Sequence, residues 1–295
     1  MFVMSFRKVW MKARANDPVV LEHARLLYRY LTDRGLDVYV DPLLGHVIPG
    51  RSLSELEARE ADLGIVVGGD GTLLRTVQKS NAVLPPILGF SSDSLGYLLP
   101  HRVDVAREVL EEVLRGNYSE RDVALGEFIA GERAGVFLNE VCVWSEPGKI
   151  VEFEVLLNDE SLYRVRGDGV IVATPAGSTG HAFSYGGPVI IDTGQRALEV
   201  VFPGALSPLI RPLIVHGGSI AVKVIAHPAN LVVDGQVYSK LQEASKVTVR
   251  PSSKSLRFIY VEKYETPLPE KLARRVLDRG LSYVVSSLFK QTPKP

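Results

Sequence analysis

The chain has 295 residues, of which 46% are hydrophobic and 23% charged, so it is long enough for two domains with separate cores. Its 34 Lys and Arg residues equal its 34 Asp and Glu residues, and this balance argues against a general nucleic-acid or membrane-surface binder. The single cysteine, Cys142, excludes an internal disulfide and a zinc site built from cysteines. The sequence contains no apolar run of about 18 residues and no signal-peptide pattern, so we expect a cytoplasmic protein without membrane or nucleic-acid partners.

Strand and helix patterns alternate over residues 1–120. Helices are expected from the Asp17-Pro18 cap to Gly35, around residues 52–59, and at residues 103–114. Short apolar strands are expected at residues 8–12, 36–40, 65–67 and 87–90. This alternation predicts an α/β domain with a parallel sheet that helices cover on both faces.

The pattern changes after residue 118. Most segments then look like strands, among them residues 135–144, and Gly, Pro and Asn-Asp turns separate them. We therefore predict a mostly antiparallel, β-sandwich-like domain over residues 121–265. A helical pattern at residues 268–289 predicts that the last segment, 266–295, packs back on the first domain.

Residues 65–74 combine a short apolar run, a glycine-rich turn and the start of a helix. Three of the four residues from Gly68 to Gly71 lack a side chain, so backbone N–H groups at a helix N-terminus can approach an anion. Asp70 interrupts these glycines, and a carboxylate repels phosphate. We interpret it as a base for a substrate hydroxyl, or as a group that acts through a metal ion, which indicates phosphoryl transfer. The loop is neither a Walker A motif nor a dinucleotide fingerprint. The alternative interpretation, that this turn only reverses the direction of the chain, therefore stays open.

Three further stretches carry polar groups among apolar strands. Residues 167–188 lead from a buried strand into a turn rich in glycine and hydroxyls, where helix capping is the simpler interpretation. Asn139 and Glu140 interrupt an apolar strand, and two successive polar groups cost free energy there unless they are paired. Asp234-Gly235 is a two-residue hairpin signal.

The six histidines show no spacing typical of a metal site, and we predict no metal-ligating residues in the chain itself.

These motifs together resemble the NAD kinase family, whose members phosphorylate the 2′-hydroxyl of the adenosine ribose of NAD. Four segments match in the order of the family: residues 68–72, 139–140, 167–188 and 234–236. Phosphofructokinases and certain lipid kinases share the Gly-Gly-Asp-Gly-Thr loop, but the combination is more specific. The resemblance implies an α/β domain followed by a β-sandwich-like domain, with the site in the cleft between them.

The resemblance also implies roles for individual residues. Asp70 would be the catalytic base, and ATP or polyphosphate would be the donor, accompanied by Mg²⁺ or another divalent cation. A homodimer or homotetramer is expected, in which a neighbouring subunit completes the pocket. The residues expected to bind the nucleotides are Gly69, Gly71 and Thr72 at the phosphate loop, Tyr97 on the adenine, Asn139 and Glu140 on the ribose and base, Asp168 at the nicotinamide end, Thr179, Gly180, His181 and Ser184 along the dinucleotide pocket, and Asp234.

The sequence departs from the family pattern at five positions. Ser91 and Asp93 stand where the family usually has Asn and Gly, Gly180-His181 stands where it usually has Ala-Tyr, and Tyr97 stands where it usually has Phe. Two alternatives therefore stay open: a kinase of another hydroxylated small molecule, and a non-catalytic dinucleotide-binding regulator. Asp70 argues against the regulator, because binding alone gains little from a carboxylate beside phosphates.

Overall fold

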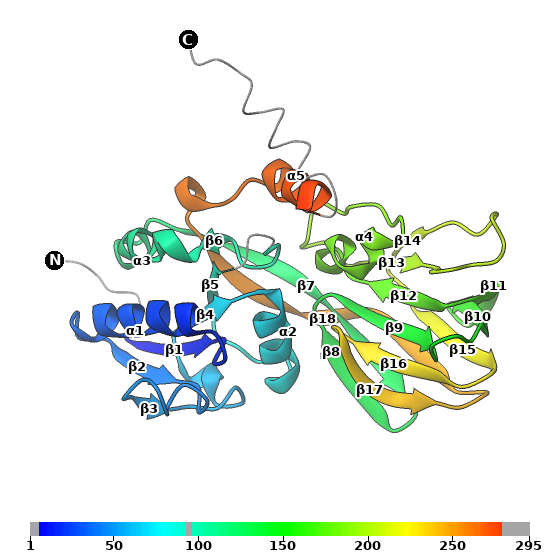
Figure 1. Ribbon diagram of the computed structural model, residues 1–295, viewed down its shortest axis with the longest axis horizontal. Helices are drawn as coiled ribbons and strands as arrows, with labels where there is room; N and C mark the ends of the chain where they lie inside the picture. The colour runs from blue at the N-terminus through cyan, green and yellow to red at the C-terminus, as the bar shows by residue number, and fades with distance from the viewer. Residues whose placement is uncertain (1–5, 93–95, 279–295) are drawn as a thin grey trace, which may run out of the picture.

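A parallel sheet with helices on both faces forms the first part of the chain (Figure 1). The computed structural model describes residues 6–92 and 96–278. Neighbouring strands of this part all run parallel. In spatial order they are β3 (Arg51–Ser52), β2 (Asp37–Val40), β1 (Lys8–Ala13), β4 (Leu63–Gly68), β5 (Ile87–Ser91) and β6 (His101–Arg102).

Alternate residues of β1 point into two different cores, as the strand period of two requires. Val9 and Met11 share one core with α1 (Pro18–Thr32) and α3 (Ala106–Leu114). Trp10 shares the other core with α2 (Asp70–Lys79). Helices therefore cover both faces of the sheet, as predicted.

The start of α1 confirms the predicted cap. The Asp17 carboxylate accepts hydrogen bonds from the N–H groups of Val19 at 3.1 Å and Val20 at 3.3 Å. The third predicted helix, at residues 103–114, begins as a 3₁₀ turn and becomes α-helical from Ala106.

The helix expected around residues 52–59 is wrong. Glu57 accepts hydrogen bonds from the N–H and hydroxyl of Ser54, at 2.9 and 2.6 Å, and this capping arrangement closes a single turn. A 3₁₀ turn, η1 (Ala58–Glu60), follows, and the next strand begins at Leu63.

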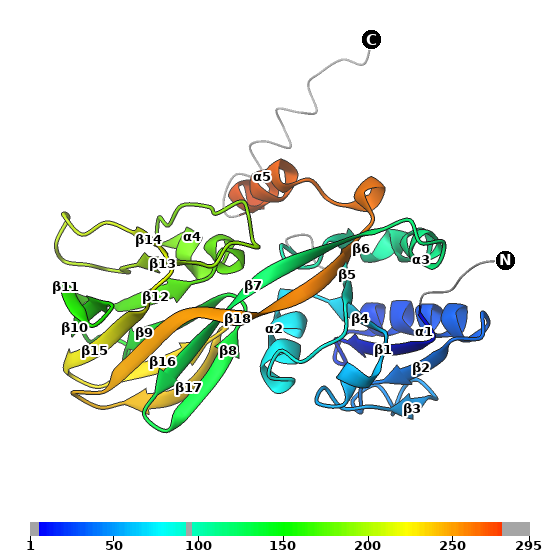
Figure 2. The ribbon, with the colours of Figure 1, turned by 180° about the vertical axis from the view of Figure 1, so that it is seen from behind.

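The second part is a sandwich of two sheets with apolar side chains between them (Figures 1 and 2). Within each layer the strands are antiparallel, as predicted. One layer contains β14 (Leu213–His216), β13 (Ala197–Val201), β12 (Gly169–Ala173), β9 (Glu140–Ser145), β16 (Ala229–Val233) and β17 (Gln236–Leu241), and the other contains β11 (Glu160–Gly167), β10 (Val151–Leu157), β15 (Ile220–Ala226), β18 (Lys246–Tyr260), β7 (Ser119–Ala130) and β8 (Arg133–Phe137).

The strand predicted at residues 135–144 is in fact two strands in different layers. β8 ends at Phe137 and pairs with β7, whereas β9 begins at Glu140 and pairs with β12 and β16. The polar residue Asn139 lies where the chain crosses from one layer to the other, and this crossing explains why the apolar pattern is interrupted there.

β18 belongs to both parts of the molecule. Near its start, Val249 pairs with Ile220 of β15, and near its end, Phe258 pairs with Ile87 of β5. β7 runs antiparallel beside it from Ser119 to Ala130 (Figure 2). One twelve-stranded sheet therefore continues through both parts. The domain limits at residues 120 and 265 stay a prediction.

The described part of the C-terminal helix, α5 (Leu268–Asp278), begins against the first domain. Thr266 N–H donates to the Pro100 carbonyl at 3.3 Å, and the Lys271 ammonium donates to the Tyr97 carbonyl at 3.1 Å. Residues 279–289 of the predicted helix lie outside the described residues. No helix among residues 6–92 and 96–278 has the length and apolar character needed to span a membrane.

His101 joins the parallel sheet to the end of β18. Its Nε2 accepts the Val261 N–H at 3.0 Å, so the ring proton lies on Nδ1, which faces the Gly89 carbonyl at 3.3 Å. The side chain is 1% exposed, and burial lowers its pKa to about 4.

We therefore expect acid to weaken the fold through His101. The pKa of this imidazole is 6.5 in the unfolded chain and about 4 in the folded chain, so between these values the unfolded chain binds a proton that the folded chain does not. The free energy of unfolding therefore falls as the pH drops across that range, by up to about 3 kcal/mol. Urea unfolding of His101→Gln at pH 7.5 and 5.0 should show a smaller acid loss than the parent, with His46→Gln as the exposed control. An equal acid loss in all three proteins would contradict this account.

Candidate active site

The glycine-rich turn joins β4 to α2. Gly68 has φ +151°, and a Cβ there would lie 2.7 Å from the Thr72 hydroxyl oxygen. Gly69 caps the helix in an extended conformation, and its carbonyl accepts the Thr72 N–H at 2.9 Å. Only glycine therefore fits at residue 68, and the turn delivers Asp70 as the first residue of α2.

The Asp70 carboxylate is oriented by backbone N–H groups. Its two oxygens accept hydrogen bonds from Tyr97 N–H at 2.9 Å and Leu98 N–H at 3.0 Å. The carbonyl of the same Tyr97 accepts a hydrogen bond from Lys271 of α5. Burial lowers the pKa of Lys271, while the charges of Glu265 and Asp70 raise it. The Tyr97 backbone thus lies between a carboxylate and a lysine.

The Asn139-Glu140 crossing is held by Asp234. The Asp234 carboxylate accepts three consecutive backbone N–H groups, from Leu138 at 3.0 Å, Asn139 at 2.8 Å and Glu140 at 3.1 Å. Asp234 is buried and has φ +47°, a conformation that few residues other than glycine adopt. The pKa of Asp234 is raised to about 7, because burial and the charge of Glu140 raise it by more than the three N–H groups lower it.

The segment after β12 folds into a 3₁₀ turn, η3 (Ala176–Thr179), and a short helix, α4 (His181–Ser184). Two of its hydroxyls donate hydrogen bonds to carbonyls three residues earlier in the chain. Ser178 donates to the Pro175 carbonyl at 2.7 Å, and Thr179 donates to the Ala176 carbonyl at 3.2 Å. These groups do not cap α4, so the capping interpretation of this stretch is wrong.

Gly180 lets α4 approach Glu140 closely. A Cβ at Gly180 would lie 2.7 Å from Glu140 Oε2. The His181 Nδ1 lies 3.0 Å from Glu140 Oε1. Glu140's side chain is 2% exposed and that of His181 59%, so the imidazole is the accessible member of the pair.

These elements enclose one pocket of about 210 Å³. It is bounded by α2 on one side, the Asn139 crossing and the Asp234 turn on another, and α4 on the third. Seven residues named from the sequence line it together with Leu74 and Gly235: Asp70, Asn139, Glu140, Gly180, His181, Ser184 and Asp234.

The other predicted residues lie around or away from this pocket. Gly69, Gly71 and Thr72 form the start of α2 beside Asp70, and Tyr97 bonds Asp70 through its backbone. Thr179 is buried and does not line the pocket. The one predicted residue in a different pocket is Asp168.

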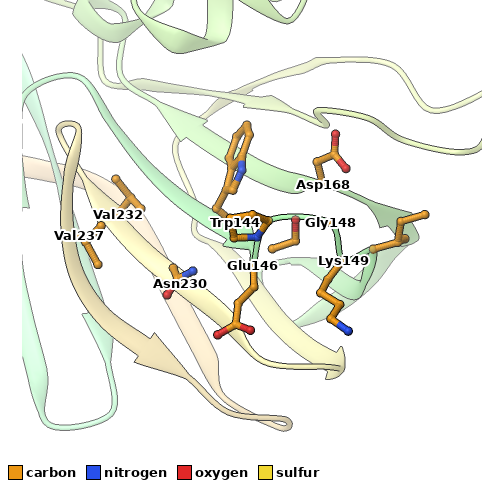
Figure 3. Close-up of a pocket in the computed structure, with 11 residues that line it drawn as sticks. Trp144, Glu146, Gly148, Lys149, Asp168, Asn230, Val232 and Val237 are labelled. Atoms are coloured by element: carbon orange, nitrogen blue, oxygen red, sulfur yellow. The ribbon is translucent and has the colours of Figure 1, made fainter.

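Asp168 lines a second pocket of about 690 Å³. Figure 3 shows the Trp144 ring and the Asp168 carboxylate pointing the same way, while Glu146 and Lys149 extend in the opposite direction. Val232 and Val237 close the pocket on the strand side. Asp168 therefore does not reach the Asp70 pocket of its own chain.

Three residues in or near this pocket were not predicted as site residues, although Gly235 belongs to the Asp234-Gly235 motif. Leu74 lies one helical turn after Asp70, and this spacing of four could have placed it on the same face. Gly235 follows Asp234 in the hairpin. Lys271 carries no sequence signal, because only the fold brings the C-terminal segment to Tyr97.

Replacing Asp234 tests whether its carboxylate holds the Asn139-Glu140 crossing. Asp234→Ala leaves three buried N–H groups without an acceptor, so we expect the free energy of unfolding to fall by about 2–4 kcal/mol. Urea denaturation measures this loss. Asp159→Ala, at an exposed turn residue that also has a positive φ, is the matched control. A loss no larger than that of the control would mean that Asp234 does not hold the crossing.

Comparisons with known proteins agree with this architecture. The family model of the ATP-NAD kinase N-terminal domain matches residues 9–118, and that of the ATP-NAD kinase C-terminal domain matches residues 138–261. The chain is 34% identical to the NAD kinase of Methanosarcina acetivorans over 280 residues, covering 92% of this chain and 100% of the relative. It is 30% identical to the NAD kinase of Pectobacterium atrosepticum, covering 88% and 93%.

Two solved structures share the fold. Yeast NADH kinase complexed with NADH superposes with a TM-score of 0.80 at 20% identity, over 94% of this chain and 88% of that one. An NAD kinase from Archaeoglobus fulgidus in complex with ATP gives 0.74 at 24% identity, over 90% and 99%. With both family domains matched in order and relatives aligned along nearly its whole length, the chain belongs to the NAD kinase family.

Proposed function

We propose that this enzyme transfers the terminal phosphoryl group of ATP to the 2′-hydroxyl of the adenosine ribose of NAD, forming NADP and ADP. The observation that carries the proposal is the Asp70 carboxylate, oriented by two N–H groups and lining the same pocket as Asn139, Glu140 and α4. In the reaction, the hydroxyl oxygen forms a bond to phosphorus as the bond to ADP breaks. The hydroxyl proton passes to Asp70.

The start of α2 offers a place for the donor phosphates. A Cβ at Gly71 would meet no atom closer than 4.0 Å, so phosphate can approach the backbone N–H groups at this helix end. Lys271 adds a cation near Asp70 from α5. Positioning and neutralisation of charge are the main requirements of phosphoryl transfer, and both are present on this side of Asp70.

The other wall of the pocket suits a hydroxyl-rich acceptor. Asn139 Oδ1 and Glu140 Oε2 are buried and accept no hydrogen bond from the described residues. A buried acceptor without a donor costs about 1–3 kcal/mol, which ribose hydroxyls or amide N–H groups would recover on binding. This supports a nucleoside acceptor on the Asn139 side.

A divalent cation, expected to be Mg²⁺, would accompany the donor. Within residues 6–92 and 96–278 no three His, Cys, Asp or Glu side chains gather as a metal site. The carboxylates that line the pocket are those of Asp70, Glu140 and Asp234, and with Asp70 and Asp234 already bonded to backbone N–H groups we expect a cation held mainly by the phosphates. Such a cation would neutralise charge on the transferred group.

The Asp70 assignment predicts a loss of turnover without a loss of binding. Asp70→Asn keeps the shape of the side chain but removes the base, so kcat should fall by about 10²- to 10⁴-fold. The Kd for NAD, measured by calorimetry, should change little, and a panel of hydroxylated acceptors with ATP or polyphosphate tests the substrate. Near-normal turnover would remove Asp70 from the chemistry.

The position of Asp168 supports a homo-oligomer. We propose that a second copy brings its Asp168 pocket to the nicotinamide end of the acceptor, because Asp168 lines a pocket other than that of Asp70 in the same chain. Exposed apolar residues, including Ile191, Leu206, Leu209 and Val237, supply surface for such an association.

This assembly predicts a mass of two or four times the 32.4 kDa of one chain. Light scattering at micromolar concentration measures the mass. Mixing Asp70→Asn chains with Asp168→Ala chains should restore part of the activity, because mixed oligomers contain sites with both residues intact. A mass of one chain would contradict the proposal.

A further inference from the structure

A second buried carboxylate lies in the same row of the sheet as Glu140. Glu140 of β9 pairs with Ala173 of β12, and Ala173 pairs with Glu199 of β13. Residues that pair directly across neighbouring strands point to the same face of a sheet. Glu140 and Glu199 therefore flank Ala173 on the face that α4 covers (Figure 1).

Glu199 is wholly buried and has no hydrogen-bond partner. Its relative exposure is 0%, and neither carboxylate oxygen is bonded to any described residue. Burial alone raises its pKa to about 8. At neutral pH the carboxyl is therefore mostly protonated, which avoids the larger cost of an unpaired buried charge.

Two glycines bring the ends of α4 against the two carboxylates. A Cβ at Gly187 would overlap the Glu199 carboxylate, just as a Cβ at Gly180 would crowd Glu140. Gly187 N–H donates to the Ala182 carbonyl at 3.0 Å and so ties this turn to α4. The four residues of α4 are thus held between a glycine contact at each end.

We propose that Glu199 is a positioning residue that favours α4 against the sheet while its carboxyl is uncharged and weakens that contact when it is charged. Ionisation of Glu199 favours a movement of the turn at Gly187 and of α4 that admits water to the charge. His181 and Ser184 then leave the wall of the Asp70 pocket, and the acceptor binds more weakly. This inference rests on the proposed function, because it takes that pocket as the acceptor site.

The direction of the pH effect follows from the two states. With α4 in place Glu199 holds its proton up to about pH 8, and with α4 displaced it titrates near 4.5. Raising the pH between these values favours displacement, by up to about tenfold per pH unit, and above pH 8 the effect levels off.

Among the described residues of the neighbouring elements, β12 carries no charged side chain, α4 carries His181, and β14 carries His216, which pairs with Ala197 two residues from Glu199. Glu140 lies beyond Ala173. The histidines belong to both the parent and any Glu199 variant, so the difference between those two proteins isolates Glu199.

The first test compares the KM for NAD at pH 6 to 9 in the parent, in Glu199→Gln and in Glu160→Gln. Glutamine keeps the shape and stays uncharged. We expect the parent KM to rise with pH up to about 8, several-fold or more relative to Glu199→Gln, with kcat less affected. Glu160, exposed on β11, is the matched control and should follow the parent. Identical pH profiles for the parent and Glu199→Gln would overturn the inference.

A second readout does not depend on activity. Trp144 lies 5.5 Å from Tyr185, ring centroid to centroid, and Tyr185 directly follows α4. The chain has two tryptophans, so a Trp10→Phe background leaves Trp144 alone to report on α4. Its emission should change with pH in that background and stay flatter with Glu199→Gln added. If NAD is not phosphorylated but the emission behaves this way, the proposed function fails and the role of Glu199 stands.

A third variant tests the contact itself. Gly187→Ala places a methyl group where the Glu199 carboxylate lies, so it should raise the KM for NAD even at pH 6. Adding Glu199→Ala makes room for that methyl and should lower the KM again. A Gly187→Ala protein with the parent's KM would show that this contact does not hold α4, and would overturn the inference.

Discussion

The pocket depends on the way Asp234 holds the chain where it crosses between the two layers of the sandwich. A crossing leaves backbone groups without partners from either sheet, and Asp234 supplies acceptors for three successive N–H groups there. Thr174 satisfies the adjacent carbonyls, with its hydroxyl donating to Leu138 and its N–H to Asn139. With the backbone of the crossing held by these hydrogen bonds, the acceptor atoms of Asn139 and Glu140 remain buried and unpaired. The folded structure thus keeps two acceptors without donors in the pocket, and a bound ligand can supply those donors.

A high density of negative charge is the second property of this pocket. Asp70, Glu140 and Asp234 line it together, and among the described residues that line it His181 is the one basic side chain. The charge of Glu140 already raises the pKa of Asp234. A phosphorylated substrate entering alone would meet repulsion from all three acids. Cations carried by the substrates, or the amide and hydroxyl donors of a nucleoside, are therefore what this surface can accommodate.

Local patterns predicted the parts of the fold that depend on neighbours in sequence. The Asp17 cap, the Gly68 turn and the change from helical to strand periodicity each involve residues within a few positions of one another, and the structure confirms them. The helix at 52–59 was wrong because the Ser54–Glu57 hydrogen bonds close a single turn that does not continue as an α-helix. Lys271 and Glu199 had no local signal as site residues: one reaches Asp70 only through the C-terminal segment, and the other is an acid in an apolar strand. Ser178 and Thr179 could not be distinguished from capping residues, because their backward hydrogen bonds depend on a turn that the sequence does not specify.

The continuous sheet formed with β18 has a consequence for how the molecule can move and assemble. Many kinases close around their substrates by rotating two bodies about a flexible linker. Here β7 and β18 pass between the two parts as paired strands, so a rotation of that kind would break ladder hydrogen bonds rather than bend a loop. Motion at the pocket is therefore confined to short segments packed on the sheet, such as α4. For the same reason the two parts are poor candidates for separate expression. The start of β5 pairs with a strand that lies about 170 residues later in the chain, and a fragment without that strand would leave this part of the β5 edge exposed to other chains.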